Sequence, residues 1–443
     1  MSTVRLTAPL HQRLTPRKEL DGTKIRCSTP PSIFYSFLGV WLILVSLENF
    51  NEIIFPYADI LLSALLFVCL CYYAKGPLRL SIPQYILVTV IVLGGILSDQ
   101  LVRGVVWGGK LTLIFAVASG INQTPRASGV LARSMIILGI IQFLFCVGST
   151  LGFSFCSGLT LGDGRLGTVL SSPGSMWRTV LFPFFFFSSY LFLAKKKSSI
   201  FLSLCGFVAM AYVIWCDGSR TAFFFIPVVF ILTAFQFRHR FHKLRIVSFA
   251  FVAVISLVFQ GSKSSGDFFD SGPIARLAEF NVSRNGVFES LVMMDSGRLR
   301  MYQSAIEDIA QSPIFGNGLL STGIRFDHDH ASLADSQVTH NAFLQLWGDL
   351  GILAVLSFLF IVLSWLPLMS KSICQLPKGD LYQSSLVVAS LGTLSVFTAC
   401  FLLHPITVTW SDWILFVAPF AVVADVASSS MIPSPNRKFE YAN

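Results

Sequence analysis

Long apolar segments set the strongest limit on what this chain can fold into. A helix needs about 20 residues to cross the hydrocarbon core of a bilayer. Because 54% of the 443 residues are hydrophobic and only 12% are charged, a soluble fold of this size cannot bury so much apolar surface. The sequence therefore predicts an all-α polytopic membrane protein with about 12 transmembrane helices. These are expected at 33–47, 53–74, 82–98, 101–119, 131–153, 177–194, 200–215, 221–237, 244–260, 342–369, 381–403 and 410–426.

The distribution of lysine and arginine predicts which segments stay in the cytoplasm. Cytoplasmic loops are the basic ones, and about two thirds of the 32 Lys and Arg residues fall on one side when loops alternate. An even number of spans puts both ends on that side, so we expect cytoplasmic tails at 1–32 and 427–443. Transmembrane helices 1–9 are expected at 33–260, a large loop on the outer side at 261–341, and helices 10–12 at 342–426. The positive charge thus needs no nucleic acid as partner, and with no cleavable signal pattern the first span is expected to stay as an anchor.

Cations on the expected outer side are informative, because the positive-inside tendency works against them. One of them lies in Cys216-Asp217-Gly218-Ser219-Arg220-Thr221, between the expected seventh and eighth spans. Asp217-Gly218 is typical of a turn, and Ser219 can cap a helix that begins at Arg220. Free backbone N–H groups at a helix start, beside a guanidinium, predict a diphosphate site. The alternative is a capped helix whose arginine only extends to the membrane interface.

The expected large loop contains an amphipathic helix with two arginines at its start. Helical spacing of apolar residues begins after Arg298 and continues until Pro313 stops it. The spacing is set by Leu299, Tyr302, Ile306 and Ile309. We expect this helix to lie along the membrane surface with Arg298 and Arg300 pointing to different sides, so that one can reach a phosphate in the membrane. Gly316-Asn317-Gly318 follows as a turn that redirects the chain.

A histidine and an asparagine directly precede the expected tenth span, in Thr339-His340-Asn341. A histidine in the first turn of a helix is close to the positive helix end, which disfavours its protonated form. A neutral imidazole can accept a proton, so His340 is the candidate general base. The alternative is a polar contact at a helix end without a chemical role.

Two further cations lie in the outer half of the expected fourth span. Arg103 and Lys110 are seven residues apart, hence on nearly the same helical face. A position facing lipid would be unfavourable for both, so we expect them to face a hydrated cavity, although Arg103 alone could extend to the interface. Gly104 and Gly108 fit close packing against a neighbouring helix.

Metal ligands are the other chemistry to consider. Asp327-His328-Asp329-His330 alternates oxygen and imidazole groups, as a metal site can. In a flexible loop, however, successive side chains point to opposite faces, and no third cluster completes a ligand set. The nine cysteines show no C-x-x-C spacing either. We therefore expect a solvated loop and no metal.

In their joint order, these motifs resemble the O-antigen ligase and polymerase superfamily. Two segments are similar to the family's Ser-Arg and Arg-x-x-Gly regions, namely Gly218-Ser219-Arg220-Thr221 and Gly164-Arg165-Leu166-Gly167 with Ser172-Pro173-Gly174. The late signature of the family is similar to Arg298, Tyr302, Pro313, Gly316-Asn317-Gly318, His340-Asn341 and Trp347-Gly348-Asp349-Leu350-Gly351. The resemblance spans most of the chain, from the loop at Arg165 to the tenth span. The chain departs from the family at Tyr302, where Trp is frequent, and at Gly174, where Asn is usual, which bears on sugar specificity more than on reaction class.

The resemblance implies an inverting membrane glycosyltransferase of the bacterial inner membrane. It would move a glycan from an undecaprenyl-diphosphate carrier to a lipid or saccharide acceptor at the periplasmic face, with no metal or other cofactor. Such a transfer needs stabilisation of the leaving diphosphate and removal of a proton from the acceptor hydroxyl. We assign Arg220 and Arg298 to the diphosphate and His340 to the acceptor. The assisting substrate-binding residues are Arg165, Lys110, Arg300, Asn341 and Arg103.

Two alternatives remain open at this point. A ligase loads a finished glycan onto a lipid core, whereas a polymerase joins repeat units and typically has two sizeable outer loops; one large and one modest loop favour the ligase. A secondary transporter also reaches about twelve spans, usually through two related halves with charges near mid-membrane. No such halves are evident, and the outer cations gather near one face.

Overall fold

The computed structural model describes residues 30–47, 57–74, 77–98, 100–124, 126–158, 166–172, 174–219, 226, 298–319, 321, 341–375, 380–403 and 410–429. Every regular element among these residues is an α-helix, as predicted, and the only β-type pairings in this part of the chain are isolated bridges. The helices are α1 (Ser32–Val45), α2 (Ala58–Tyr73), α3 (Ile82–Leu97), α4 (Leu101–Gln123), α5 (Ala127–Thr150), α6 (Met176–Leu193), α7 (Lys197–Asp217), α12 (Arg298–Gln311), α13 (Ala342–Leu350), α14 (Ile352–Leu363), α15 (Leu366–Gln375), α16 (Leu381–Leu403) and α17 (Trp410–Ser429).

Six of the described helical segments are long and apolar enough to cross a membrane. They correspond to α4, α5, α6, α7, α14 with α15, and α16, while α1, α2 and α3 are shorter apolar helices. The expected spans at 221–237, apart from Ile226, and at 244–260 lie outside the described residues. The expected large loop is described only from α12 to Ser321 and at Asn341. The count of about 12 spans therefore stays a prediction.

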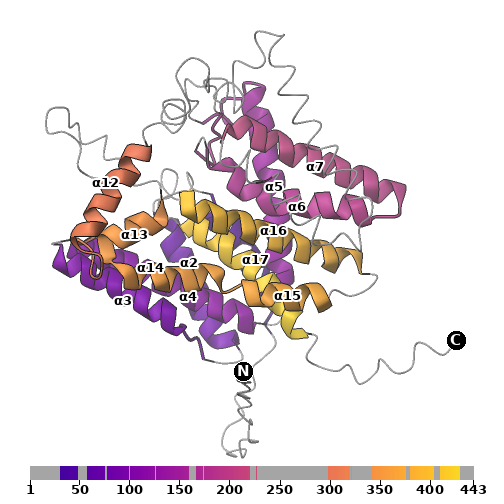
Figure 1. The fold of residues 1–443 in the computed structure, drawn as a ribbon. Helices are drawn as coiled ribbons and strands as arrows, with labels where there is room; N and C mark the ends of the chain where they lie inside the picture. The colour runs from indigo at the N-terminus through magenta and orange to yellow at the C-terminus, as the bar shows by residue number, and fades with distance from the viewer. Residues whose placement is uncertain are drawn as a thin grey trace, which may run out of the picture.

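The two last helices form the centre of the bundle. In the most apolar stretch of α16, 83% of the residues are buried inside the protein, whereas in that of α7 only 22% are. The α16 helix is therefore central and α7 peripheral. The α17 helix packs against α16 and also contacts α4, α5 and α15. Figure 1 shows α16 and α17 in yellow between the α3–α4 pair on one side and α5, α6 and α7 on the other. The C-terminal part of the chain is thus held by helices from the N-terminal half.

The α3–α4 hairpin is packed through backbone contact. A Cβ atom built on Gly104 would lie 2.9 Å from the Cα atom of Gly95, and one built on Gly108 would lie 2.7 Å from Cγ2 of Val92. Any larger side chain at these positions would push the two helices apart. The predicted close packing at Gly104 and Gly108 is confirmed, and α3 is the partner helix.

The expected tenth span is not one continuous helix. It consists of α13, α14 and α15, with breaks at Gly351 and at Ser364 and Trp365. At the first break Gly351 has φ 77° and ψ −176°, a backbone conformation that residues with a Cβ rarely adopt. A periodic apolar pattern continues across the glycine, which is why the sequence alone predicted a single span.

Side-chain contacts show that α5 runs antiparallel to α17 whereas α6 runs parallel to it, as expected for consecutive spans α5 and α6. At one side of the bundle, Arg178 at the start of α6 contacts Asp412 at the start of α17. At the other side, Ser128 at the start of α5 bonds Asp425 near the end of α17. The start of α5 is the end that the basic loops predict to be cytoplasmic.

Cysteine labelling in a cysteine-free background tests this orientation. We expect Ser154→Cys, in the exposed connection after α5, to react with a membrane-impermeant maleimide on intact spheroplasts. Lys196→Cys, between α6 and α7, should react only after permeabilisation, because basic loops remain inside. The reverse pattern would put the predicted diphosphate site on the cytoplasmic face and contradict the expected topology.

Candidate active site

The predicted site residues differ in how much of them the structure describes. Arg165, Arg220 and His340 lie outside the described residues. Arg298 and Arg300 are the first and third residues of α12, described as backbone only. The fully described members are Arg103, Lys110 and Asn341. The site is therefore built from the segments that adjoin the predicted residues in sequence.

A buried carboxylate closes the end of α7, next to the Gly218-Ser219-Arg220 motif. Asp217 is the last residue of α7 and is fully buried. Its Oδ1 accepts hydrogen bonds from the backbone N–H groups of Gly174 (3.1 Å) and Met176 (2.8 Å). Met176 is the first residue of α6, so Asp217 satisfies donors that a helix start leaves unpaired. Sequence reasoning treated Asp217 only as a turn residue, although an acid at the end of a long apolar segment already signals a specific partner.

The loop before α6 is bound to the same end of α7. The N–H of Leu166, the residue after Arg165, donates to the carbonyl oxygen of Cys216 at 3.0 Å. Buried Gln142 of α5 holds the loop from the other side, donating to Thr168 Oγ1 (3.0 Å) and accepting from Ser171 Oγ (3.2 Å). These bonds bring the sequence neighbours of Arg165 and Arg220 together at one place.

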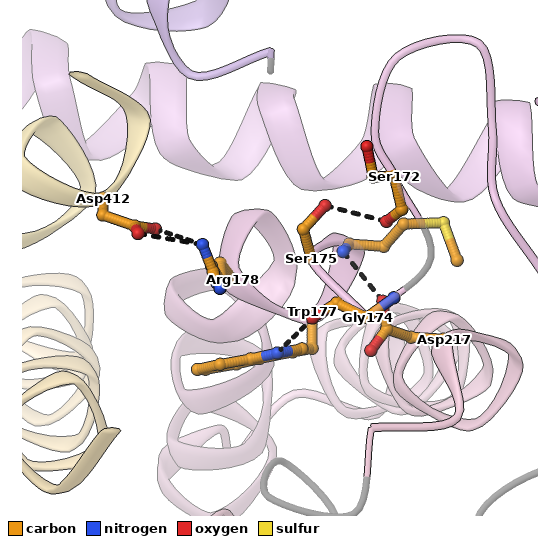
Figure 2. Close-up of polar contacts among 8 residues, drawn as sticks. Ser172, Gly174, Ser175, Trp177, Arg178, Asp217 and Asp412 are labelled. Atoms are coloured by element: carbon orange, nitrogen blue, oxygen red, sulfur yellow. Dashed lines mark hydrogen bonds and ion pairs between the residues drawn. The ribbon is translucent and has the colours of Figure 1, made fainter. Parts of the chain in front are cut away.

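An ion pair lies beside this loop. Nη1 of Arg178 in α6 donates to both carboxylate oxygens of Asp412 in α17, at 2.7 and 2.9 Å, and both side chains are largely buried. The guanidinium lies 5.8 Å from the ring centroid of Trp177, whose Nε1–H donates to the carbonyl of Gly174 at 3.0 Å. The pair thus connects α17 to the loop that Asp217 holds (Figure 2). Sequence analysis did not identify it, because the two residues are far apart in the chain.

Aromatic rings connect this region to the start of α13. Phe343, in the first turn of α13, contacts Phe358 of α14 at a centroid distance of 5.4 Å. Phe358 contacts Phe401 of α16 at 5.7 Å. The contacts continue through Phe397 to Trp177, at 6.2 and 6.0 Å. The segment that adjoins His340 and the loop that adjoins Arg165 therefore flank one aromatic cluster.

The turn after α12 binds the end of α13 through its backbone. The N–H groups of Asn317 and Gly318 donate to the carbonyls of Gly348 (2.8 Å) and Asp349 (2.9 Å). The Asn317 side chain also donates to the carbonyl of Asp308 in α12, at 2.8 Å. We call this set of bonds between 316–318 and 348–351 the backbone clamp. It fixes α12, which begins at Arg298, relative to α13, which follows His340.

Three glycines allow the clamp to close. Gly316, Gly318 and Gly351 have φ values of 75°, 104° and 77°. A Cβ on Gly316 would lie 2.4 Å from the carbonyl carbon of Asp349, and one on Gly351 would lie 2.0 Å from the carbonyl oxygen of Ile314. The glycines of the turn at 316–318 and the glycine at 351 thus permit the same close approach of two backbone segments.

The clamp also reaches the α3–α4 hairpin. The N–H of Leu319 donates to Ser98 Oγ at the end of α3, at 3.1 Å. Arg103 follows in the first turn of α4 with an exposed side chain, and Lys110, about two helical turns further along, is half-buried. The hairpin therefore brings Arg103 to the end of the bundle that carries the clamp. The structure shows no direct contact of either cation with the other predicted residues in the described part of the chain.

The side-chain oxygen of Asn341 caps the start of α13. Its Oδ1 accepts from the N–H groups of Phe343 (3.0 Å) and Leu344 (3.1 Å), which makes it the N-cap of α13. The helix begins at Ala342, so the expectation that His340 lies in the first turn is wrong: His340 precedes the cap. The carboxamide NH₂ of Asn341 still offers donors to a substrate.

Comparison with known families gives the chemical context. Residues 205–359 match the O-antigen ligase family, Wzy_C. This part of the chain is similar to the O-antigen ligase family. A search among curated proteins found no significant match.

The matched segment contains most of the predicted site. It includes Asp217 at the end of α7, the predicted Arg220, Arg298 and His340, and the whole backbone clamp. Arg103, Lys110 and Arg165 precede the matched segment. The ends of this segment that the structure describes rest on α3, α6 and α16, so helices before and after the matched residues position it.

Substitution of a clamp glycine tests whether the clamp holds the site. Gly316→Ala should weaken the domain by about 1–3 kcal/mol, because alanine is strained at positive φ and its Cβ meets the Asp349 carbonyl. We expect a lower midpoint of thermal unfolding in detergent and reduced glycan transfer. The matched control is Gly129→Ala in α5, where a Cβ meets nothing within 4 Å. Equal midpoints and rates for both variants would show that the clamp is dispensable.

Proposed function

We propose that this protein transfers a glycan from a polyprenyl-diphosphate carrier to an acceptor at the extracytoplasmic membrane face, as an O-antigen ligase. The observation that carries the proposal is the segment at 205–359 that matches the O-antigen ligase family. Its described ends, Asp217 and the segment from Asn341, flank one aromatic cluster. Membrane-spanning helices of suitable length fit a substrate that is itself embedded in the bilayer.

The proposed reaction is a single displacement at the anomeric carbon. An acceptor hydroxyl oxygen attacks that carbon, the bond to the diphosphate oxygen breaks, and the configuration inverts. The diphosphate leaves with additional negative charge, which Arg220 and Arg298 would stabilise through paired hydrogen bonds. The hydroxyl proton would pass to His340. No step in this scheme requires a metal or a redox cofactor.

The bonded segments support these roles, because they hold together described neighbours of the assigned residues. Leu166 bonds Cys216, which supports a shared position for Arg165 and Arg220. The clamp ties α12 to α13, which supports a shared position for Arg298 and His340. The start of α12 adds backbone donors suited to an anion. Arg300, Arg103 and Lys110 are proposed to add positive charge around the carrier phosphates, and Asn341 to contact the substrate through its carboxamide nitrogen.

The same chemistry would serve a polymerase that joins repeat units. Deletion of the gene followed by analysis of surface glycans separates the two activities. A ligase predicts full-length polymer that stays on its carrier, whereas a polymerase predicts loss of polymer length. Unchanged surface glycans would contradict both and favour a transporter with another cargo.

The diphosphate assignment is tested by Arg220→Lys, with Arg298→Lys as a second variant. Lysine keeps the charge but loses the planar fork that bonds two phosphate oxygens. We expect transfer from purified donor in membranes to fall sharply, with normal expression. Arg133→Lys, an exposed cation of α5, is the control and should leave the rate unchanged. Wild-type rates for both site variants would contradict the diphosphate assignment and leave the two arginines with a role as membrane anchors.

The general-base assignment is tested by His340→Gln. Glutamine keeps a polar group but cannot take a proton near neutral pH, so transfer should fall by about a hundredfold or more with donor binding nearly intact. Wild-type activity should decrease as the pH falls and the imidazole becomes protonated, and this acid limb should vanish in the variant. His242→Gln, in a predicted cytoplasmic loop, is the control. Full activity with an unchanged pH profile would remove His340 from the chemistry.

A further inference from the structure

A cavity of about 210 Å³ opens at the end of the bundle opposite the clamp. It lies between the start of α3, the second half of α4, the end of α14 and the first half of α17. From Gln84 at the cavity to Ser98 at the clamp, α3 rises by about 21 Å. The polar end of the cavity, at Arg79 and Gln84, therefore adjoins the other membrane face, whereas its inner wall at Trp413 contacts Phe358 and Phe401 of the aromatic cluster.

The polar side chains of the cavity are hydrogen-bond donors suited to an anion. They are Arg79, Ser81, Gln84, Ser119 and Asn122; the hydroxyl of Ser364, which also lines the cavity, donates to the carbonyl of Ile361. No aspartate or glutamate from the described part of the chain lines the cavity. One guanidinium surrounded by amide and hydroxyl groups favours a phosphate over a cation or a neutral sugar.

Hydrogen bonds hold the segment that carries Arg79 in place. The backbone N–H of Arg79 donates to Ser119 Oγ of α4 at 3.2 Å. Gln123 Nε2 donates to the carbonyl of Pro77 at 3.1 Å, and the N–H of Ser81 donates to Gln84 Oε1 at 2.7 Å. Residues 77–81 before α3 are thus fastened to α4, so the backbone position of Arg79 is set before any ligand arrives.

The opposite wall of the cavity is aromatic. Phe115 of α4 and Trp413 of α17 are in edge contact at a centroid distance of 5.5 Å, and Phe416 and Phe420 of α17 extend the same wall. A free inorganic anion would gain no binding free energy from this wall, because burial of apolar surface is favourable only against apolar groups. A ligand with a phosphate at one end and hydrocarbon at the other matches both sides.

We propose that this cavity binds the headgroup of one anionic phospholipid from the cytoplasmic leaflet. The phosphate contacts Arg79 and the surrounding donors, and the first methylenes of the acyl chains lie on the aromatic wall. The volume equals that of roughly seven water molecules, which suits a glycerophosphate group whose chains continue into the bilayer. Basic pockets between helices on the cytoplasmic side are suited to such lipids. The site is independent of the proposed glycan transfer.

Native mass spectrometry of the full chain, titrated with dioleoylphosphatidylglycerol in detergent, tests the proposal. We expect the wild-type protein to bind one such lipid. Arg79→Ala should bind it with an affinity lower by about tenfold or more, as loss of a bond to a charged group implies. Ala118→Phe, which fills the cavity, should also remove the bound lipid. Arg133→Ala, an exposed cation outside the cavity, and Leu202→Phe, on the outer face of α7, should bind like the wild type.

Competition distinguishes the lipid from a free anion. Inorganic phosphate added in excess should leave the lipid bound, and dioleoylphosphatidylcholine should bind more weakly than the anionic lipid. Displacement by inorganic phosphate would overturn the proposal in favour of a small-anion site. Equal lipid binding by the wild type, Arg79→Ala and Ala118→Phe would show that the lipid binds elsewhere, and would also overturn it. Either failure leaves the proposed transferase activity untouched, since that activity is measured through Arg220 and His340.

Discussion

Backbone groups inside a bilayer must find hydrogen-bond partners within the protein, because hydrocarbon offers none. Continuous helices meet this requirement by themselves, and a broken helix does not. At Gly351 the helix ends and leaves the carbonyls of its last turn without intrahelical partners. Asn317 and Gly318 supply the missing donors. The break and the turn after α12 therefore depend on each other, and together they fix how α12 lies against α13.

Buried ionisable side chains likewise have polar partners within the protein. Arg178 is paired with Asp412, and Asp217 is bonded by two N–H groups at the start of α6. Removing one member of such a set would leave an unpaired charge in an apolar surrounding, which is strongly destabilising. Arg178 is thus occupied by a carboxylate, which distinguishes it from the arginines assigned to the diphosphate. The proposed catalytic cations come from connections and helix starts, where a substrate can approach them.

The sequence predicted the helical class and most span positions, because apolar runs near bilayer length have few other solutions. It also predicted the helix after Arg298 and the tight contact at Gly104, since period and small residues are local signals. It did not predict the break at Gly351, because the apolar pattern continues through the glycine. Nor could it pair Arg178 with Asp412, or Asp217 with Gly174, since one sequence carries no information on contacts between distant segments. The roles of Arg165, Arg220 and His340 remain predictions, because these residues lie outside the described part of the chain.

The bonds to Asp217 also bear on the order in which the protein is assembled. The N–H groups of Gly174 and Met176 belong to residues synthesised 43 and 41 positions before their acceptor. The partner of Leu166, the Cys216 carbonyl, is equally late. While a chain emerges from its N-terminal end, the loop before α6 has none of these acceptors until the end of α7 has been made. The bonds of this loop to the end of α7, unlike its bonds to Gln142 of α5, are therefore expected to form only after α6 and α7 have both been inserted. Completion of that hairpin is thus the earliest step at which this side of the site can be complete.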